Sequence, residues 1–296
     1  MSQFTITTPA SCANIGPGFD SLGIALNRYL TLHVVSQETW EFEHCSPLLP
    51  ANEHYEDHLI YQVAQRTADR HGRTLPPCKV KMDSEIPLAR GLGSSASAVM
   101  AGIELANQLC KLSLSTTDKL AYGSEIEGHP DNIAPALLGG LVITVQTPDE
   151  EIDYIQLPTL DLDLVAYIPD FELKTAAARE VLPETYSRER AAFGSGVSNL
   201  MVASLITGNY ELAGKMMEKD IFHEPFRAKL IPNYTTIKEQ AKKQGAYGTI
   251  ISGAGPVMIS FVPKTQTDKV VAHMKRLLPD YEVTQLQVDE CGLQIT

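Results

Sequence analysis

The segment from Pro87 to Ala98, Pro-Leu-Ala-Arg-Gly-Leu-Gly-Ser-Ser-Ala-Ser-Ala, limits what this chain can fold into more than any other feature. Its two glycines and three serines stand directly before an apolar stretch, Ser95–Leu109, that is typical of a buried helix. Glycines let backbone N–H groups approach an anion, and a helix N-terminus adds unpaired donors and the positive end of its dipole. The segment therefore predicts a loop that binds phosphate and leads into a helix.

The same segment lacks the lysine that follows the last glycine of a Walker A loop. Positive charge would then come from Mg²⁺, with Ser94 or Ser95 as an oxygen ligand or as a donor beside the ion. The alternative is a helix cap of small residues that binds no ligand. The segment by itself leaves both interpretations open.

A second loop, Pro9–Gly23, lies between two expected strands and carries three glycines together with Asn14 and Asp20. Asn and Asp side chains in such loops can form turns by binding their own backbone. They can also accept hydrogen bonds from an ammonium or hydroxyl group of a small polar substrate. The loop favours neither role over the other.

A third polar cluster begins at Glu125. Five polar residues fall within eight positions, and a carboxylate among them could hold Mg²⁺ while a neighbouring side chain contacts an acceptor hydroxyl. The five are Glu125, Glu127, His129, Asp131 and Asn132. Taken alone, His129 is more often a loop histidine with satisfied hydrogen bonds. The chain has no H-E-x-x-H motif, and its other histidines form no set with metal-ligand spacing.

The turn Gly253-Ala254-Gly255-Pro256 is a fourth glycine segment. It does not fit a dinucleotide fingerprint, because no glycine stands three residues after Gly255 and a strand rather than a helix is expected to follow. It is interpreted as a glycine turn that approaches a ligand loop, or as a simple hairpin turn.

Strand and helix patterns alternate along the first half, and a polar, proline-marked stretch from Thr147 to Pro158 follows. We place a domain boundary there, which gives domains of residues 1–157 and 158–296. The second half then predicts the order β-α-α-β-β-α-β, which suggests a split βαβ sandwich of ferredoxin type. Its expected elements are strands at Leu162–Ile168, Tyr247–Ile251, Val257–Val262 and Tyr281–Val288, and helices at Ala191–Leu205, Tyr234–Lys243 and Lys269–Leu277.

Composition narrows the function classes. The 296 residues carry a net charge of −12, which argues against a nucleic-acid partner and against an anionic membrane surface. The five cysteines are scattered without a C-x-x-C pair, as expected of free thiols in a reducing cytosol. Residues 1–6 have neither a basic nor an apolar leader pattern, and no apolar run reaches the length of a membrane span. We expect a globular protein of the cytoplasm.

Taken together, these segments resemble the galacto-, homoserine, mevalonate and phosphomevalonate (GHMP) kinase superfamily. Pro87–Ser97 resembles its phosphate loop, and Ile251–Pro256 resembles its C-terminal glycine motif. Within the superfamily, four segments are similar to the homoserine kinases: Pro9–Gly23, Glu127–Asn132, Thr175–Arg179 and Glu224–Arg227. The resemblance covers the whole chain, with six motifs in order.

The resemblance implies an α+β, two-domain GHMP kinase fold. Its N-terminal ATP-binding domain would resemble ribosomal protein S5 domain 2, and its C-terminal domain would be ferredoxin-like. The implied reaction converts ATP and L-homoserine to O-phospho-L-homoserine and ADP, a step of threonine biosynthesis. The implied cofactors are ATP and Mg²⁺, and the implied assembly is a homodimer.

The resemblance also assigns roles to residues. The phosphate loop, Pro87, Leu88, Ala89, Arg90, Gly91, Leu92, Gly93, Ser94, Ser95, Ala96 and Ser97, would surround the ATP phosphates. Glu127 and Ser95 would hold Mg²⁺, with Ser94 the less favoured serine. Asn14 and Asp20 would receive the amino end of homoserine, and Arg179 and Arg227 its carboxylate, because a guanidinium matches a carboxylate bidentately. His129 and Asn132 would line the reacting hydroxyl, with Asp131 beside them.

Two alternatives remain at this point. One is a kinase of the same superfamily for another alcohol, such as mevalonate or a sugar, which would leave Asp20 without an ammonium partner. The other is a non-catalytic ligand sensor on the same fold, which a damaged glycine loop or a missing Glu127 would favour. Both features are intact here.

Overall fold

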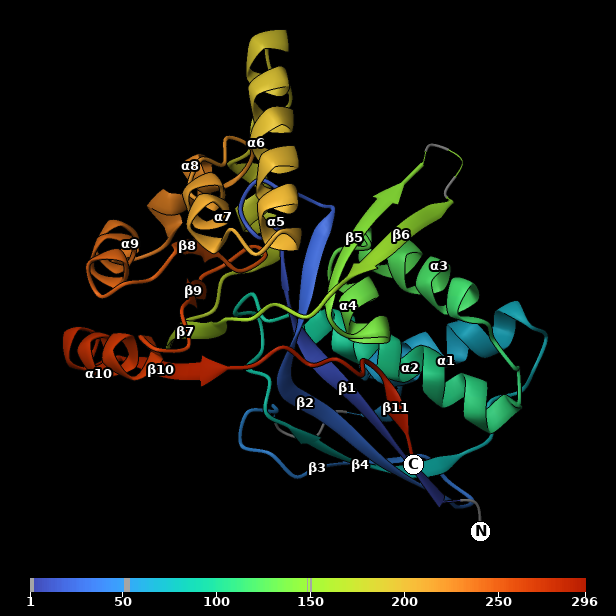
Figure 1. The fold of residues 1–296 in the computed structure, drawn as a ribbon. Coiled ribbons are helices and arrows are strands. Elements are labelled where there is room, and N and C mark those ends of the chain that lie inside the picture. Colours follow the sequence, from blue (N-terminus) through green and yellow to red (C-terminus); the bar gives the residue numbers. More distant parts are fainter. Residues whose placement is uncertain (1–2, 51–53, 148, 150) are drawn as a thin grey trace.

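Two β-sheets organise the computed structural model, which describes residues 3–50, 54–147, 149 and 151–296 (Figure 1). Of the segments discussed above, residues 1–2 of the N-terminus and residues 148 and 150 of the expected boundary lie outside the described residues. The two sheets face different sets of helices, and the predicted functional loops lie where the two halves meet.

The first sheet has the strand order β11-β1-β2-β4-β3, and β5 and β6 extend it from the start of β2. Helices α1 to α4 lie together on one side of it (Figure 1). Its strands are β1 (Gln3–Ala13), β2 (Leu22–Ser36), β3 (Glu41–His44), β4 (Cys78–Ser84), β5 (Leu141–Gln146), β6 (Ile152–Leu157) and β11 (Gln294–Ile295). Its helices are α1 (Leu59–Arg70), α2 (Ser94–Cys110), α3 (Thr116–Glu127) and α4 (Ile133–Leu138), with a 3₁₀ turn at Tyr55–Asp57.

The second sheet has the order β10-β7-β9-β8 with all pairs antiparallel. Numbered within this half, the order is 4-1-3-2, which confirms the split βαβ arrangement predicted from the element order. Its strands are β7 (Asp163–Pro169), β8 (Gly248–Ile251), β9 (Met258–Val262) and β10 (Tyr281–Leu286). Its helices are α5 (Thr175–Glu180), α6 (Arg188–Ile206), α7 (Tyr210–Met217), α8 (Glu224–Arg227), α9 (Tyr234–Lys243) and α10 (Thr267–Leu277), with a 3₁₀ turn at Ala228–Leu230.

A continuous apolar core joins the two halves. Alternate residues of β7 face opposite sides of its sheet, as the period of a strand requires. Val165 and Tyr167 pack in a cluster with residues of α9 and α10. Leu164 and Ala166 pack instead in the main core, which also contains first-sheet residues such as Ile24. The halves therefore present a fixed surface to each other, on which a site between them can be built.

Helix α2 shows why the phosphate loop is held in place. The helix is apolar nearly all round, and most of its residues from Ala96 to Asn107 are buried. A helix without a polar face is stable only inside a protein. It contacts β1 and helices α1, α3 and α4 on different sides, so its N-terminus, where the loop ends, has little freedom to move.

The structure contains elements that the sequence-based predictions lacked, among them the helices α5, α7 and α8, and two further differences concern the expected boundary and the C-terminal residues. The expected boundary stretch contains strand β6, which pairs antiparallel with β5 from Gln146↔Ile152 to Leu141↔Leu157. Most of its side chains are exposed, so backbone pairing rather than an apolar face holds this strand, and its sequence shows no strand pattern. In addition, the last residues return to the first sheet, where Ile295 pairs with Ile6.

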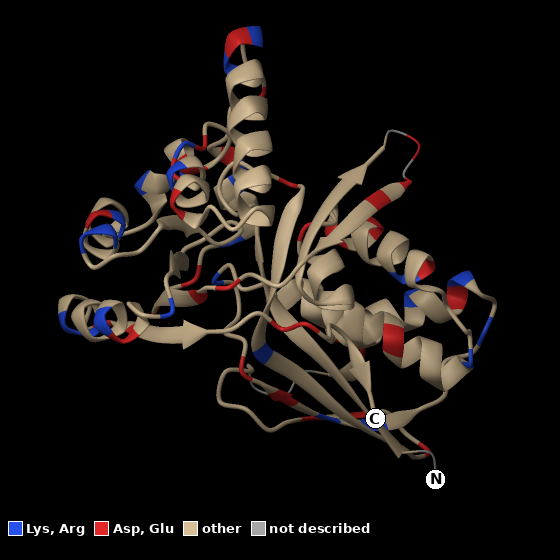
Figure 2. Cartoon of the chain, in the orientation of Figure 1, with Lys and Arg blue, Asp and Glu red and all other residues tan. Residues whose placement is uncertain are grey.

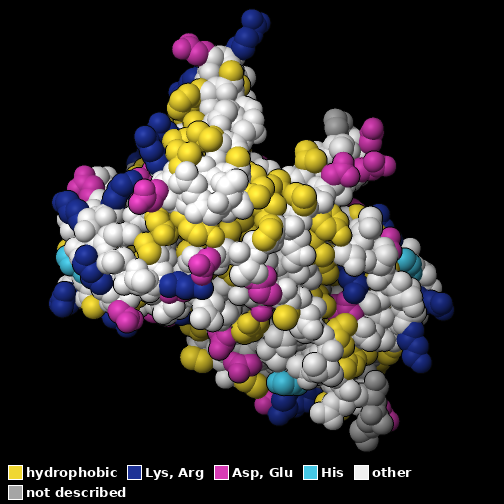
Figure 3. Space-filling view, in the orientation of Figure 1, with side chains coloured by type: hydrophobic (Ala, Val, Ile, Leu, Met, Phe, Trp, Pro, Cys, Tyr) yellow, Lys and Arg dark blue, Asp and Glu magenta, His cyan; other side chains and the backbone are white. Residues whose placement is uncertain are grey.

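Helix α6 projects from the second half (Figure 1). Its far end carries basic and acidic residues side by side, and the tip of the β5–β6 hairpin is acidic (Figure 2). Apolar side chains follow α6 and continue over the surface between it and the hairpin (Figure 3). The large exposed apolar residues of these two elements are Phe193, Leu200 and Ile206 on α6 and Val145, Tyr154 and Ile155 on the hairpin. Within the described residues, no helix is both long and apolar enough to cross a bilayer.

Candidate active site

A cleft of about 480 Å³ lies between the two halves. Residues from every predicted functional segment line it, although they are as many as 242 positions apart in the chain, from Ala13 to Gly255. The predicted site residues that line the cleft are Asn14, Asp20, Leu88, Ala89, Gly91, Gly93, Ser94, Ser95, Glu127, His129, Asp131, Asn132, Arg179 and Arg227.

The phosphate loop has the backbone that its sequence predicts. Gly91 and Gly93 adopt φ angles of 84° and 68°, a region that costs other residues conformational energy. A Cβ on Gly93 would lie 2.1 Å from the Ser11 hydroxyl oxygen. No side chain of the described residues caps the start of α2, and the first N–H groups of a helix have no partner within it. The helix therefore presents unpaired donors and a positive dipole end at the cleft.

The second half of the chain fixes the loop from the other side. The Leu173 N–H donates to the Ala89 carbonyl oxygen at 2.9 Å, and the Val257 N–H donates to that of Arg90 at 3.1 Å. The Ser252 hydroxyl donates to the Gly91 carbonyl oxygen at 2.5 Å. The glycine turn between β8 and β9 thus approaches the predicted phosphate loop, which favours that interpretation over a simple hairpin turn.

Five members of the predicted loop do not line the cleft: Pro87, Arg90, Leu92, Ala96 and Ser97. Leu92 and Ala96 are buried in the core. The Ser97 hydroxyl donates to the Pro9 carbonyl oxygen at 2.8 Å. The Arg90 guanidinium turns toward the second half, where it donates to the Pro169 carbonyl oxygen at 3.1 Å. It anchors the loop and leaves no cation on the loop itself for a phosphate.

Glu127 and Ser95 meet at the start of α2, where the Ser95 hydroxyl donates to a Glu127 carboxylate oxygen at 2.8 Å. A carboxylate and a hydroxyl are oxygen ligands of the kind that Mg²⁺ prefers. Glu125 is the other carboxylate considered, but it points elsewhere and pairs with Arg66 and Arg70 at 2.6 Å each. Its hydrogen bond to Arg70 is the main reason that its pKa is lowered. The geometry favours Glu127 over Glu125 for a metal ion beside the phosphate loop.

His129 and Asp131 form a pair at the floor of the cleft, with His129 Nδ1 2.5 Å from Asp131 Oδ1. Burial by itself lowers the pKa of His129, but the hydrogen bond to Asp131 and the nearby carboxylates outweigh burial and raise it. The raised pKa favours the imidazolium form, which adds positive charge at this point. With Nδ1 held by Asp131, the Nε2 side of the ring remains for a group in the cleft.

Asn132 is oriented by Ser11, a residue that the sequence analysis did not single out. The Ser11 hydroxyl donates to Asn132 Oδ1 at 2.8 Å, which makes Oδ1 the acceptor and leaves the Nδ2 protons as donors. Among the described residues Nδ2 has no hydrogen-bond partner. Asn132 is therefore arranged to donate to an oxygen in the cleft.

Asp20 and Arg179 form an ion pair with each other across the two halves. Arg179 Nη2 lies 3.0 Å from Asp20 Oδ1, and Nη1 lies 3.3 Å from Oδ2. This is the bidentate geometry that an arginine makes with a carboxylate. The acid expected to bind an ammonium group and the arginine expected to bind a carboxylate thus neutralise each other.

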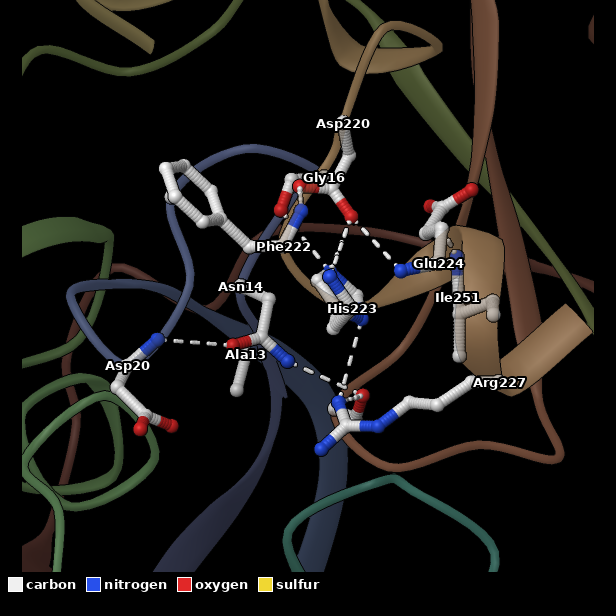
Figure 4. A network of polar contacts seen from close by, with 12 residues as sticks. Ala13, Asn14, Gly16, Asp20, Asp220, Phe222, His223, Glu224, Arg227 and Ile251 are labelled. Carbon is white, nitrogen blue, oxygen red and sulfur yellow. Dashed lines mark hydrogen bonds and ion pairs between the residues drawn. The ribbon is translucent and has the colours of Figure 1, made fainter. Parts of the chain in front are cut away.

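Asn14 lines the cleft, but both ends of its amide bind the chain itself. Its Nδ2 donates to the Gly253 carbonyl oxygen at 3.0 Å, and its Oδ1 accepts from the Asp20 N–H at 3.0 Å. The side chain stabilises the loop that carries Asp20 and ties it to the second half (Figure 4). These contacts fit the turn-forming interpretation of Asn14 better than direct ligand binding.

Arg227 is almost wholly buried, and three groups of the chain hold it. Its Nε donates to the Ala178 carbonyl oxygen at 3.1 Å, and its Nη1 donates to the Gly253 carbonyl oxygen at 2.9 Å and to His223 Nδ1 (Figure 4). Its Nη2 has no partner among the described residues. Burial, followed by the nearby Arg179, lowers the pKa of Arg227 to about 10, so the residue remains charged at neutral pH.

Three titratable side chains, Asp20, His129 and Asp131, offer ligand atoms within 4.8 Å of one another. Two of the three are already paired with each other, and Asp20 is paired with Arg179. An imidazole is also a poor ligand for Mg²⁺. The Glu127–Ser95 pair is therefore the better candidate for that ion.

The far end of the cleft is apolar, and the sequence analysis missed it. Residues from β2, β4, the start of α1 and the loop after β3 line it: Leu30, His44, Leu49, Pro50, His58, Leu59, Ile60, Met82, Ser84 and Ile86. Two histidines give it polar atoms, with His44 Nε2 3.1 Å from His58 Nε2. Burial lowers the pKa of His58 to about 4. The segments carry no motif, so only their common place in the fold identifies them.

Comparisons with known proteins agree with this geometry. Models of the GHMP kinases match the chain twice, the N-terminal domain over residues 58–140 and the C-terminal domain over residues 201–280. A homoserine kinase of Oceanobacillus iheyensis is 52% identical over 297 residues, covering 100% of this chain and 99% of that protein. The structure of a putative homoserine kinase from Listeria monocytogenes has a TM-score of 0.85 at 39% identity and covers 99% of both chains. That of a homoserine kinase from Cytophaga hutchinsonii has a TM-score of 0.86 at 27% identity, covering 100% of this chain and 98% of the other.

Proposed function

Because this chain belongs to the GHMP kinase family and, within it, to the homoserine kinases, we propose that its cleft transfers the γ-phosphoryl group of ATP to the hydroxyl of L-homoserine. The products are O-phospho-L-homoserine and ADP, a step of threonine biosynthesis. The observation that carries the proposal is the meeting, in one cleft, of a phosphate loop with an acid and two arginines suited to an amino acid. A mevalonate or sugar substrate would leave Asp20 without a cationic ligand group, and nothing in the site favours those alternatives.

ATP binds along the cleft with its phosphates on the loop and its nucleoside at the apolar end. The unpaired N–H groups at the start of α2 receive phosphate oxygens. Leu49, Met82 and Ile86 provide the apolar walls expected around a base. His44 and His58 provide polar atoms beside it.

Mg²⁺ is held by Glu127 with Ser95 beside the phosphate loop, where the two side chains already meet. The residues fit such an ion, because both offer hard oxygen donors next to the expected phosphates. When bound, the ion supplies positive charge to the β- and γ-phosphates. This matters in a site whose loop arginine, Arg90, is turned toward the second half.

Homoserine binds at the Asp20 end. Its ammonium group pairs with Asp20, and its carboxylate pairs with Arg179 and with the unused Nη2 of Arg227. An α-amino acid carries both charges close together, so it can take the place of each ion in the Asp20–Arg179 pair. Asn14 supports this end by holding the loop, and any contact of its own with the amino group is secondary.

His129 and Asn132 serve the transfer itself. The Nδ2 of Asn132 donates to an oxygen of the hydroxyl or the transferred phosphoryl group, and the imidazolium of His129 adds positive charge. Phosphoryl transfer needs positioning and charge neutralisation more than a strong base. We therefore assign His129 to charge stabilisation, with Asp131 orienting it, and assign no residue as a dedicated base.

We further propose a cytoplasmic homodimer with domains of residues 1–157 and 158–296. The exposed apolar surface on α6 and the β5–β6 hairpin is the candidate dimer face, because basic residues at the tip of α6 could meet the acidic hairpin of a second copy (Figures 2 and 3). Sedimentation of the wild type beside a Phe193→Glu variant tests this assembly. A wild type that sediments as a monomer would contradict it.

A coupled ADP-release assay tests the substrate. We expect turnover with homoserine and little with serine, mevalonate or galactose. In the same assay, Arg179→Ala and Arg227→Ala should each raise the KM for homoserine. The loss of a charged hydrogen bond should weaken homoserine binding by about 1–3 kcal/mol. The effect should shrink with a homoserine ester, which lacks the carboxylate, and the KM for ATP should change little. Singles that keep the wild-type KM for homoserine would place the carboxylate site elsewhere.

A further inference from the structure

His223 is a fully buried histidine that no sequence motif singled out, at the residue before α8. Its ring connects Gly16 and Arg227, which are 211 positions apart in sequence. Nε2 lies 3.0 Å from the carbonyl oxygen of Gly16, and Nδ1 lies 3.2 Å from Nη1 of Arg227 (Figure 4). One partner belongs to the loop that carries Asp20, and the other is the buried arginine of the carboxylate site.

These two contacts assign the tautomer of the ring. A carbonyl oxygen only accepts hydrogen bonds, so Nε2 must carry a proton. A guanidinium only donates, so Nδ1 must be the acceptor and carry none. Both bonds form only in the neutral Nε2–H tautomer, and a second proton would place Nδ1–H against the Arg227 donor.

The surroundings of His223 support the neutral form. Asp220 is the nearest carboxylate, but its oxygens accept from the backbone N–H groups of Phe222, His223 and Glu224 at 2.7 to 2.9 Å. The closest approach of Asp220 to the ring is longer, 3.6 Å. Burial is the main reason that the pKa of His223 is lowered, although the carboxylates of Asp220 and Glu224 act against it.

Phe19 extends the same connection. Its ring stacks on His223 with centroids 5.6 Å apart, and the Arg227 guanidinium lies 5.5 Å from its centroid. Phe19 directly precedes Asp20, so the stack joins the loop to the arginine a second time. His223 thus contacts both ends of the expected substrate site but touches neither the phosphate loop nor any group that would bind ATP.

We propose that His223, in its neutral Nε2–H form, is a positioning residue that sets the distance between the ammonium site at Asp20 and the carboxylate site at Arg227. It holds Nη1 of Arg227, so that Nη2 faces the cleft, and it holds the Gly16 end of the Asp20 loop. It thereby determines affinity for an α-amino acid without contacting the substrate. This inference rests on the homoserine site proposed above.

Two substitutions test the two hydrogen bonds of His223, to Gly16 and to Arg227, one at a time. In His223→Asn the amide oxygen can take the place of Nδ1 and accept from Arg227, but the side chain is too short to reach Gly16. In His223→Gln the amide nitrogen can take the place of Nε2 and donate to Gly16, but the acceptor for Arg227 is lost. We expect each variant to raise the KM for homoserine at least fivefold while the KM for ATP stays within twofold.

A homoserine ester distinguishes the variants further. The effect of His223→Gln should shrink with the ester, because Arg227 then has no carboxylate to bind, whereas the effect of His223→Asn should persist. His71→Gln is the matched control, because His71 is an exposed histidine of the first half that contacts the Tyr122 hydroxyl. It should leave both KM values unchanged.

Arg227→Ala in the same series distinguishes a failure of the positioning role of His223 from a failure of the proposed function. If Arg227→Ala raises the KM for homoserine but both His223 variants keep the wild-type value, the positioning role is wrong and the proposed function stands. Equal rises in the KM for ATP and homoserine would also reject it, since they indicate a general structural defect. If Arg227→Ala has no effect, the carboxylate site itself is misplaced, and the role given to His223 falls with it.

A measurement on the unaltered protein covers the case in which the variants fail to fold. Nitrogen NMR of ¹⁵N-histidine-labelled enzyme at pH 7 should show His223 as the neutral Nε2–H tautomer, with a signal that shifts on addition of homoserine but little on addition of ADP. An Nδ1–H tautomer or an imidazolium would overturn the proposal. So would a His223 signal that does not respond to homoserine.

Discussion

Replacing Asp20 by Asn is the sharpest test of the substrate site, because it changes a charge while keeping the shape of the side chain. In the structure Asp20 pairs with Arg179 through contacts of 3.0 and 3.3 Å. At the proposed site, homoserine exchanges this pair for two new ones, its ammonium with Asp20 and its carboxylate with Arg179. The substitution therefore removes one favourable contact in the complex and one in the free enzyme.

The two losses differ in size. A hydrogen bond to a charged group contributes about 1.5–3 kcal/mol. The Asp20–Arg179 pair contributes less, about 0.2–1 kcal/mol, because the side chains are 35% and 40% exposed and water screens them. The difference leaves about 0.5–3 kcal/mol of weakened binding, which corresponds to a roughly 2-fold to 100-fold rise in the KM for homoserine.

The assay is ADP release at saturating ATP with homoserine varied, followed by ATP varied at saturating homoserine. The KM for ATP should stay within about twofold of wild type, since Asp20 makes no contact with the phosphate loop. Asp161→Asn is the control, because Asp161 also pairs with a basic residue, Lys264, but outside the cleft. A folded Asp20→Asn enzyme with an unchanged KM for homoserine would refute the reasoning, and so would an equal rise in both KM values.

Three further substitutions test other parts of the structure. Glu127→Gln should lower kcat and raise the Mg²⁺ concentration for half-maximal activity, because the amide loses the charge that holds the ion. Lys119→Met should lower the free energy of unfolding by about 3–5 kcal/mol in urea titrations, because it leaves the fully buried Glu104, 2.6 Å from Lys119 Nζ, without its cation. His58→Gln should remove a pH dependence: with a pKa near 6.5 unfolded and about 4 folded, His58 binds its proton more readily in the unfolded chain. Wild-type stability should then fall by roughly 2 kcal/mol between pH 7.5 and pH 5 from this group, and the variant should not show that loss.

The first two of these substitutions have a matched control. Glu125→Gln removes a neighbouring carboxylate that pairs with Arg66 and Arg70 outside the cleft. This variant should have the same Mg²⁺ dependence as wild type. If Glu127→Gln also titrates like wild type, Glu127 is not a ligand of the ion. Lys269→Met removes an exposed lysine of α10 and should change stability by less than about 0.5 kcal/mol. A Lys119→Met variant that is equally stable would show that the Lys119–Glu104 pair does not stabilise the fold, and a His58→Gln variant with the same pH profile as wild type would reject the buried neutral histidine.

Much of the fold follows from local sequence patterns. Helix α2 was predicted from small and apolar residues on all its sides, and the order of elements in the second half predicted its split βαβ sheet. Strand β6 was not predicted, because it is held mainly by backbone hydrogen bonds to β5. Such bonds do not depend on the side chains, so the side-chain pattern does not indicate them. The pairing of β11 with β1 was missed for a related reason, since a strand of two residues is too short to show a period.

In the candidate site, too, the local motifs could be predicted from the sequence and the long-range contacts could not. Motifs whose chemistry is local, the glycine loop and the cluster around Glu127, were predicted from the sequence and meet in the cleft. The contacts that orient them were not: Ser11 on Asn132 and His223 on Arg227 join distant or unremarkable residues. Neither Ser11 nor His223 belongs to a type or spacing that indicates a function, so only the folded chain assigns them a role.

Arg179 shows how a structural and a functional interpretation can both be right. An arginine chosen without context is expected to be a solvated partner in a surface ion pair, and Arg179 is half exposed and paired. Its partner, however, is Asp20, so the two charges neutralise each other, and in the proposed site each of them can pair with one charge of a zwitterion. A ligand with only a carboxylate would occupy Arg179 and leave Asp20 unpaired, and a ligand with only an amine would do the reverse. Leaving a charge of a partly buried pair without its partner costs binding energy. The pair therefore discriminates against both kinds of half-matched ligand before any contact with the reacting hydroxyl is made.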